Sequence, residues 1–130
     1  MQWQITNDAP VYAQLIAHIR QAIASGAFQP GERLPSVRDL ATEAGVNPNT
    51  MQRALAQLES EGLVYSQRTA GRFVTEDATR IGETKRDLAQ RHVARFMEAM
   101  RSLAISREET LALLETEFGK ETGTNECPDM

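Results

Sequence analysis

The sequence predicts a mainly α-helical fold with one small β-hairpin. Three stretches, residues 10–25, 36–44 and 48–61, repeat apolar side chains at helical spacing and are bounded by residues that favour helix ends. Two short runs follow, residues 63–67 and 72–75, with a glycine-containing turn between them, as in a hairpin. Because two helices joined by a short turn with glycine form a helix-turn-helix, the hairpin behind them is expected to be its wing. The predicted fold class is therefore a winged helix-turn-helix followed by a short two-helix tail.

The first helix is expected to bury one apolar side. Asn7 and Asp8 are cap-type residues just before it, and a proline suits its first turn. After the helix, a Pro-Gly pair predicts a tight turn, for which Phe28 and Leu34 are the expected buried anchors. The apolar side of the helix comprises Val11, Leu15, Ile16, Ile19 and Ile23.

The second and third helices have their own start signals. Ser36 and Asp39 stand at the spacing of a capping box, in which each side chain bonds the backbone of the other residue. Asn47 is expected to cap the third helix, with Pro48 at the first helical position, where a proline needs no amide partner. Gly62 then ends the third helix before the first strand of the wing.

The composition changes after the wing, where an amphipathic helix with a narrow apolar stripe is expected over residues 79–104. Ser106 and Glu109 form a second capping box, which predicts another helix over residues 107–118. Residues 119–130 have almost nothing apolar to bury, so disorder is expected there. The predicted organisation is a winged domain at 1–76, a helical tail at 77–118 and a disordered end at 119–130.

The bulk composition favours a soluble cytoplasmic protein. No apolar run approaches the ~20 residues that span a bilayer, and the first residues lack the pattern of a signal peptide. The single cysteine, Cys127, excludes an internal disulfide. The net charge is −4, but residues 1–76 carry six arginines against seven acidic side chains. A nucleic-acid partner therefore depends on whether these arginines share one face, and the total charge is a weak guide.

Four segments resemble the GntR family of bacterial regulators: PGERLPSVRDLA at 30–41, GVNPNTMQRA at 45–54, LESEGLV at 58–64 and GRFV at 71–74. The VNPNT segment and the short helical tail resemble the YtrA-like subfamily in particular. The resemblance implies a winged domain that binds operator DNA as a dimer, a tail that dimerises, and target genes that often encode ABC transporters. Thr69 stands where the family usually has the first of two wing glycines, which leaves open how deeply the wing tip enters the minor groove.

The third helix is the expected recognition helix, which buries one side and presents the other to the major groove. At about 100° per residue, its apolar residues fall on one side, Asn49 and Arg53 lie opposite, and Thr50 and Gln52 flank them. Arginine can bond guanine, asparagine and glutamine can bond adenine, and threonine can meet a phosphate or a thymine methyl group. A competing interpretation makes Arg53 a solvated side chain that rests against Asn49 or Gln57.

Further cations are expected beside the recognition helix and on the wing. Arg38 could instead pair with Asp39 or Glu43, but the resemblance implies that it reaches DNA. Arg68 and Arg72 flank the wing tip, where cations meet phosphate or a narrow minor groove; the alternative is plain surface charge. The predicted DNA-binding residues are Arg38, Asn49, Thr50, Gln52, Arg53, Arg68, Gly71 and Arg72.

The tail is expected to form a homodimer, because its apolar side chains would otherwise stay exposed to water. The alternative is that the tail folds back on its own winged domain. The predicted dimerisation residues are Val93, Phe96, Met100, Leu103, Leu111, Leu114 and Phe118.

These observations favour a sequence-specific transcriptional regulator, a repressor that binds an inverted-repeat operator as a homodimer. The alternative is a winged module that binds protein rather than DNA, which the acidic total charge supports. An enzyme is not expected, since the 54 residues after position 76 are too few for the aminotransferase-like domain that some GntR relatives carry. No cofactor or metal is expected, because His18, His92 and Cys127 lack metal-ligand spacing, and no polar cluster defines an effector pocket.

Overall fold

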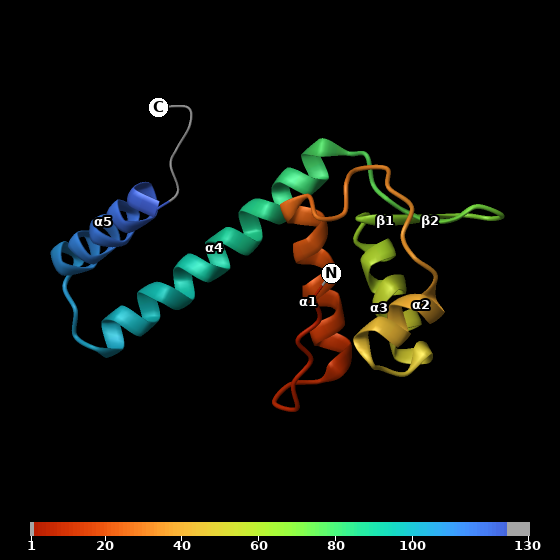
Figure 1. The fold of residues 1–130 in the computed structure, drawn as a ribbon, viewed down its shortest axis with the longest axis horizontal. Coiled ribbons are helices and arrows are strands. Elements are labelled where there is room, and N and C mark those ends of the chain that lie inside the picture. The colour runs from red at the N-terminus through yellow and green to blue at the C-terminus, as the bar shows by residue number, and fades with distance from the viewer. Residues whose placement is uncertain (1, 125–130) are drawn as a thin grey trace. The chain divides into compact units, whose positions relative to one another are not determined.

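The computed structural model describes residues 2–124, which form five helices and one two-stranded sheet. The elements are α1 (Val11–Ser25), α2 (Val37–Ala44), α3 (Pro48–Ser60), β1 (Val64–Gln67), β2 (Gly71–Val74), α4 (Ala78–Ser102) and α5 (Arg107–Thr124) (Figure 1). The chain divides into two compact units, Met1–Ala89 and Gln90–Met130, and the boundary falls inside α4. This order of three helices, hairpin and two further helices confirms the predicted fold class.

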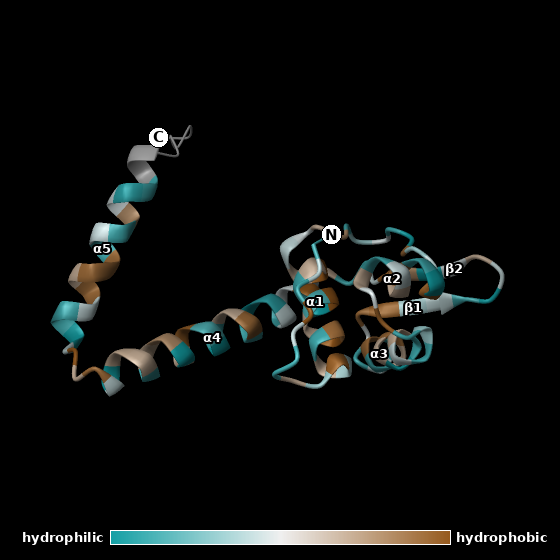
Figure 2. Ribbon diagram, turned by 60° about the horizontal axis from the view of Figure 1, so that its bottom comes forward, coloured by the Kyte–Doolittle hydropathy of each residue, from teal (hydrophilic) through white to brown (hydrophobic). Residues whose placement is uncertain are grey.

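One apolar core holds the N-terminal unit together, and α3 packs against both α1 and α2 within it. α1 and α3 each carry apolar residues on one side and polar residues on the other (Figure 2). Leu34 is buried and Phe28 is half-buried against the core, so both predicted anchors of the turn before α2 are confirmed. The largest fully buried side chains are Leu15, Ile19, Ile23, Leu40, Met51, Leu55, Leu58, Leu63, Val64 and Val74.

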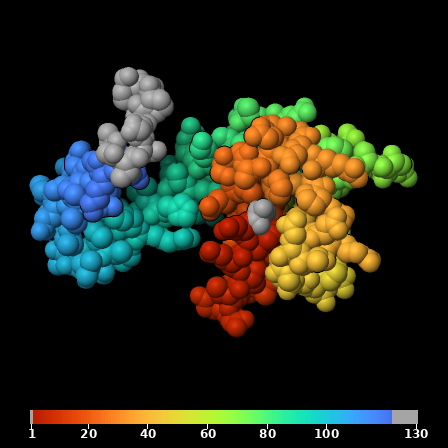
Figure 3. Space-filling view, viewed as in Figure 1, coloured from red at the N-terminus to blue at the C-terminus, as the bar shows by residue number. Residues whose placement is uncertain are grey.

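The hairpin is anchored at its base by the turn that precedes α2. β1 and β2 pair antiparallel, with Val64 opposite Val74. The backbone N–H of Leu34 donates to the carbonyl oxygen of Arg72 at 2.8 Å, and the N–H of Val74 donates to that of Glu32 at 2.9 Å. The second edge of β2 is therefore paired, while the loop between the strands projects from the surface of the unit (Figure 3).

Local capping starts α2 and α3. The Ser36 hydroxyl accepts a hydrogen bond from the Asp39 backbone N–H at 3.0 Å, but within the described residues no bond runs from the Ser36 N–H to the Asp39 side chain, so only one of the two bonds of the predicted capping box is present. The Asn47 side-chain oxygen accepts from the Asn49 N–H at 2.7 Å. Each cap satisfies a backbone donor that the helix leaves free, so each helix start is defined by residues within one turn.

The predicted caps of α1 are wrong. Its N-cap is Pro10, and no side chain bonds the free backbone groups there. Instead the Gln14 amide in the first turn reaches backwards and donates to the carbonyl oxygens of Thr6 and Ala9 at 2.9 and 2.8 Å. Proline has no side-chain acceptor that could bond the free N–H groups of the first turn, so α1 lacks the kind of side-chain cap that α2 and α3 have.

The start of α4 belongs with the N-terminal unit, beyond the domain end expected at residue 76. Ile81 is half-buried and packs against the core of that unit. Asp77 caps the helix, because its side chain accepts hydrogen bonds from the N–H groups of Thr79 and Arg80 at 3.0 and 3.2 Å. No helix of the described residues is long and apolar enough to cross a membrane.

The second unit contains the predicted capping box and a longer helix than the sequence suggested. Ser106 and Glu109 exchange both bonds, at 3.3 and 3.1 Å. α5 then continues through Gly119 to Thr124, so the expected disorder from residue 119 is wrong up to that point, and residues 125–130 lie outside the described part. A glycine inside a helix costs only about 1 kcal/mol relative to alanine, so it does not by itself end a helix.

Candidate nucleic-acid interface

The outer face of α3 carries the polar side chains that the periodicity placed there. Asn49, Gln52 and Arg53 are exposed and Thr50 is half-buried, while Met51 on the opposite side is fully buried. The core therefore holds α3 by one side and leaves a row of hydrogen-bonding groups free on the other. Such a helix, presented by a second helix and a short turn, is the element that enters a major groove.

Arg53 lies over the ring of Tyr12, with its guanidinium carbon 4.4 Å from the ring centroid. Tyr12 comes from the first turns of α1, so the neighbours expected for Arg53, Asn49 and Gln57, are not its partners. Among residues 2–124, Arg53 takes part in no hydrogen bond or ion pair. Its charge therefore remains available at the surface.

The contact between Tyr12 and Arg53 could not be predicted from the sequence, because the two residues are 41 positions apart. Tyr12 is one of only two tyrosines in the chain and is half-buried near the start of α1. An aromatic side chain half-exposed beside a recognition helix is the signal that could have identified it, but only once α1 was known to pack on α3.

Arg38 is exposed on α2 and free of the acidic neighbours considered for it. Within the described residues its side chain forms no ion pair, so pairing with Asp39 or Glu43 is excluded. Glu43 instead accepts a hydrogen bond from the indole N–H of Trp3 at 3.3 Å. Arg38 thus lies at the surface of the helix that precedes the recognition helix, with its donors unused.

The two wing arginines differ in their surroundings. Arg68 is exposed in the loop and has no ion-pair partner in the part of the chain that the structure describes. Arg72 is only 20% exposed, and its Nε lies 3.7 Å from a carboxylate oxygen of Glu59 on α3. Ser66 donates to the same carboxylate oxygen at 3.1 Å, so Glu59 ties both strands to α3. Arg72 therefore holds the wing in place, whereas Arg68 is the free cation of the loop.

A further cation lies beside the loop end of the wing. Gly71 has a φ of +106°, and a Cβ at this position would lie 3.1 Å from the Arg33 Nε. The close approach of the Arg33 side chain explains why glycine is required here, in addition to its backbone conformation. Sequence reasoning placed Gly71 in the DNA-binding set and did not include Arg33, which is exposed.

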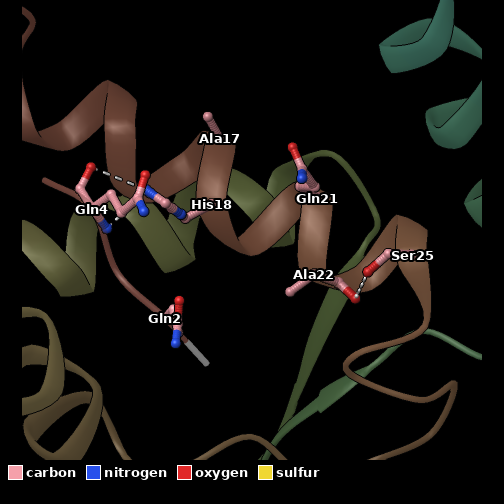
Figure 4. Close-up of a pocket in the computed structure, with 7 residues that line it drawn as sticks. All are labelled: Gln2, Gln4, Ala17, His18, Gln21, Ala22 and Ser25. Carbon is pink, nitrogen blue, oxygen red and sulfur yellow. Dashed lines mark hydrogen bonds between the residues drawn. The ribbon is translucent and has the colours of Figure 1, made fainter. Parts of the chain in front are cut away.

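A hollow of 440 Å³ lies against α1 beside the N-terminal residues (Figure 4). Gln4 and His18 face each other across it, with the Gln4 backbone N–H 3.4 Å from the His18 Nε2, and Ser25 donates to the Ala22 carbonyl oxygen. Among the described residues, its polar side chains are those of Gln2, Gln4, His18, Gln21 and Ser25.

The tail exposes several large apolar side chains, and no residue of α4 is buried. The residues concerned come from both tail helices and from the turn between them. The exposed fractions are Val93 59%, Leu103 65%, Leu111 48%, Leu113 52% and Phe118 61%. Phe96, Met100 and Leu114 are half-buried, and the last two line an apolar hollow of 360 Å³ together with Leu111. Leu113 was missing from the predicted set.

The arrangement of α2, a glycine turn, α3 and a hairpin defines a winged helix-turn-helix domain, a class of DNA-binding domain. A family model described as bacterial regulatory proteins, gntR family, matches residues 11–74. YhcF of Bacillus subtilis (strain 168), described as an uncharacterized HTH-type transcriptional regulator, is 34% identical over 116 residues, which cover 89% of this chain and 96% of YhcF. YtrA of the same organism, described as an HTH-type transcriptional repressor, is 39% identical over 72 residues, 55% of each chain. The chain belongs to the GntR family of bacterial regulatory proteins.

Solved structures agree with this assignment. A GntR family transcriptional regulator from Listeria monocytogenes has a TM-score of 0.80 and 36% identity, covering 85% of this chain and 97% of that one. The structure titled AraR(DBD) in complex with operator ORX1 has a TM-score of 0.53 and 29% identity, covering 58% of this chain and 96% of that one. The likeness thus includes a relative of the winged domain that was solved on operator DNA.

Proposed function

We propose that this protein is a cytoplasmic transcriptional repressor that binds an inverted-repeat operator as a homodimer and has no catalytic role. The observation that carries the proposal is the outer face of α3, where Asn49, Gln52 and Arg53 are exposed above a fully buried side. The description of YtrA as a repressor supports repression rather than activation. The operator complex of AraR(DBD) supports operator DNA as the ligand.

The proposed contacts divide by chemistry. Arg53, Asn49 and Gln52 read base edges in the major groove, because their planar side chains can make paired hydrogen bonds to guanine or adenine. Thr50 and Arg38 contact the phosphate backbone and fix the register of the helix. The exposed cation of the wing loop, Arg68, adds a phosphate or minor-groove contact, whereas Gly71 and Arg72 act by shaping and anchoring the wing.

The tail supplies the proposed dimer contact. Leaving Val93, Leu103, Leu111 and Leu113 between 48% and 65% exposed is unfavourable, since burying a large apolar side chain stabilises by about 1.5–3 kcal/mol. In a two-fold symmetric dimer the same surface of both subunits forms the interface, so each of these residues is buried in both copies. Two recognition helices related by the same axis then meet two inverted half-sites.

The proposal is tested by letting the full-length protein select from a random-sequence duplex library and measuring its affinity for the selected DNA by fluorescence anisotropy. We expect an inverted repeat and a steep fall of affinity with salt, which reflects release of counterions from phosphates. Arg38→Ala and Arg68→Ala should each flatten the slope of log K against log salt by about the amount that one phosphate contact contributes. Arg91→Ala, on an exposed position of α4, is the matched control and should leave the slope unchanged. Recovery of no common sequence would contradict the proposal and favour a protein-binding module.

A further inference from the structure

Tyr12 supports Arg53 in a way that leaves the hydrogen-bonding edge of the guanidinium free. The guanidinium carbon Cζ lies over the ring, 4.4 Å from its centroid, which is a cation–π contact. An ion pair with a carboxylate would use the N–H donors in hydrogen bonds, whereas this contact leaves them without a hydrogen-bond acceptor. Arg53 is accordingly exposed and makes no hydrogen bond to any of residues 2–124.

The carboxylates at the C-terminal end of α3 and just after it are already engaged, so they do not compete for Arg53. Glu61 is bound by Arg20 of α1 at 2.6 Å and also accepts a hydrogen bond from Gln57 at 3.0 Å. Glu59 accepts from Ser66 and lies 3.7 Å from Arg72. Neither carboxylate forms an ion pair with Arg53, so the Arg53 guanidinium keeps its hydrogen-bond donors free within the described residues.

We infer that Tyr12 is a positioning residue for base recognition: it holds Arg53 in one conformation on the DNA-facing side of α3 and contacts no base itself. This inference rests on the proposed function, in which Arg53 reads a base. A free arginine side chain loses several rotamers when it binds, and a side chain held in advance on an aromatic face loses fewer. Without the ring, we expect affinity to fall about two- to tenfold for each half-site.

The test uses the full-length protein and DNA selected by the wild type, with every base substituted in turn at each half-site position. Tyr12→Leu removes the aromatic face, whereas Tyr12→Phe keeps it and serves as the matched control. We expect Tyr12→Leu to relax base preference at the same position as Arg53→Ala, and Tyr12→Phe to bind within about twofold of the wild type. A structural defect in α1 would weaken binding to all sequences equally, so a loss confined to one base position separates the two roles.

Coupling between the two residues provides a second measurement. If Tyr12 acts through Arg53, the double variant should bind no more weakly than Arg53→Ala alone. In the free protein, nuclear Overhauser contacts between the Tyr12 ring and the Arg53 δ-methylene protons are expected, and they remain measurable even if Tyr12→Leu does not fold.

Three results would overturn the inference while leaving the proposed function intact: unchanged base preference in Tyr12→Leu, additive losses in the double variant, or weakened binding by Tyr12→Phe, which would give the hydroxyl a direct contact. Absence of the ring contacts in the wild type would also overturn it. A wild-type protein that selects no DNA sequence would remove the proposed function and this inference together.

Discussion

Leu103 follows the last turn of α4 and is 65% exposed, the largest exposure among the large apolar side chains of the tail. Replacing it with serine removes an apolar group that the proposed dimer would bury. Complete burial of a leucine stabilises by about 1.5–3 kcal/mol, so the part still exposed can contribute about 1–2 kcal/mol. A two-fold dimer contains the residue twice, which gives a loss of about 2–4 kcal/mol and a dimer dissociation constant raised about 30- to 700-fold.

Sedimentation equilibrium of the full-length protein over nanomolar to micromolar concentrations measures this shift directly. Arg91→Ala is the matched control, because Arg91 is an exposed residue of α4 on the side of the helix opposite the apolar stripe, and it should leave the dissociation constant unchanged. A Leu103→Ser protein that dimerises as tightly as the wild type would refute the assignment of this surface. A wild-type protein that is monomeric at micromolar concentration would refute the dimer itself.

Two further predictions concern the stability of the fold, measured by urea unfolding at one protein concentration. Arg20→Met should lower the free energy of unfolding by about 1–3 kcal/mol, because it leaves the half-buried carboxylate of Glu61 without its 2.6 Å partner. The control Arg101→Met breaks an exposed ion pair and should lower it by less than about 0.5 kcal/mol. Equal losses in the two variants would contradict the importance of burial. Gly82→Ala should stabilise α4 by about 0.5–1 kcal/mol, because alanine favours a helix and open space surrounds the new methyl group. Gly26→Ala should destabilise the protein by about 1–2 kcal/mol, because the φ of +88° at this position is left-handed. A destabilised Gly82→Ala protein would contradict this account.

Capping and periodicity were sufficient to predict most of the secondary structure. Ser36, Asn47 and Ser106 each bond a backbone group within three residues, so the sequence alone contains both partners. The same locality explains the buried side of α3, where Met51 and Leu55 follow from helical spacing. The predictions that failed were the cap of α1 and the end of α5 at residue 118, because local signals are weak at both places.

Which arginines are free to contact DNA could not be predicted from neighbouring residues in the sequence. Arg38, Arg53, Arg68 and Arg72 look alike in the sequence, yet Arg72 is held by Glu59 and the guanidinium of Arg53 lies over the ring of Tyr12. Arg33 approaches Gly71 at the loop end of the wing, and nothing in its local sequence indicates this contact. These contacts join side chains from different elements, so they depend on how the elements pack.

The order of the elements, the buried side of each helix in the winged domain and the family can all be predicted from the sequence, because they depend on residues within a few positions of one another. Which cations keep their hydrogen-bond donors free and which large apolar residues of the tail remain exposed depends on tertiary packing. An ion pair, a cation–π contact and a buried side chain each require two segments distant in the chain to be brought within a few ångströms, and only the packing of the core does this.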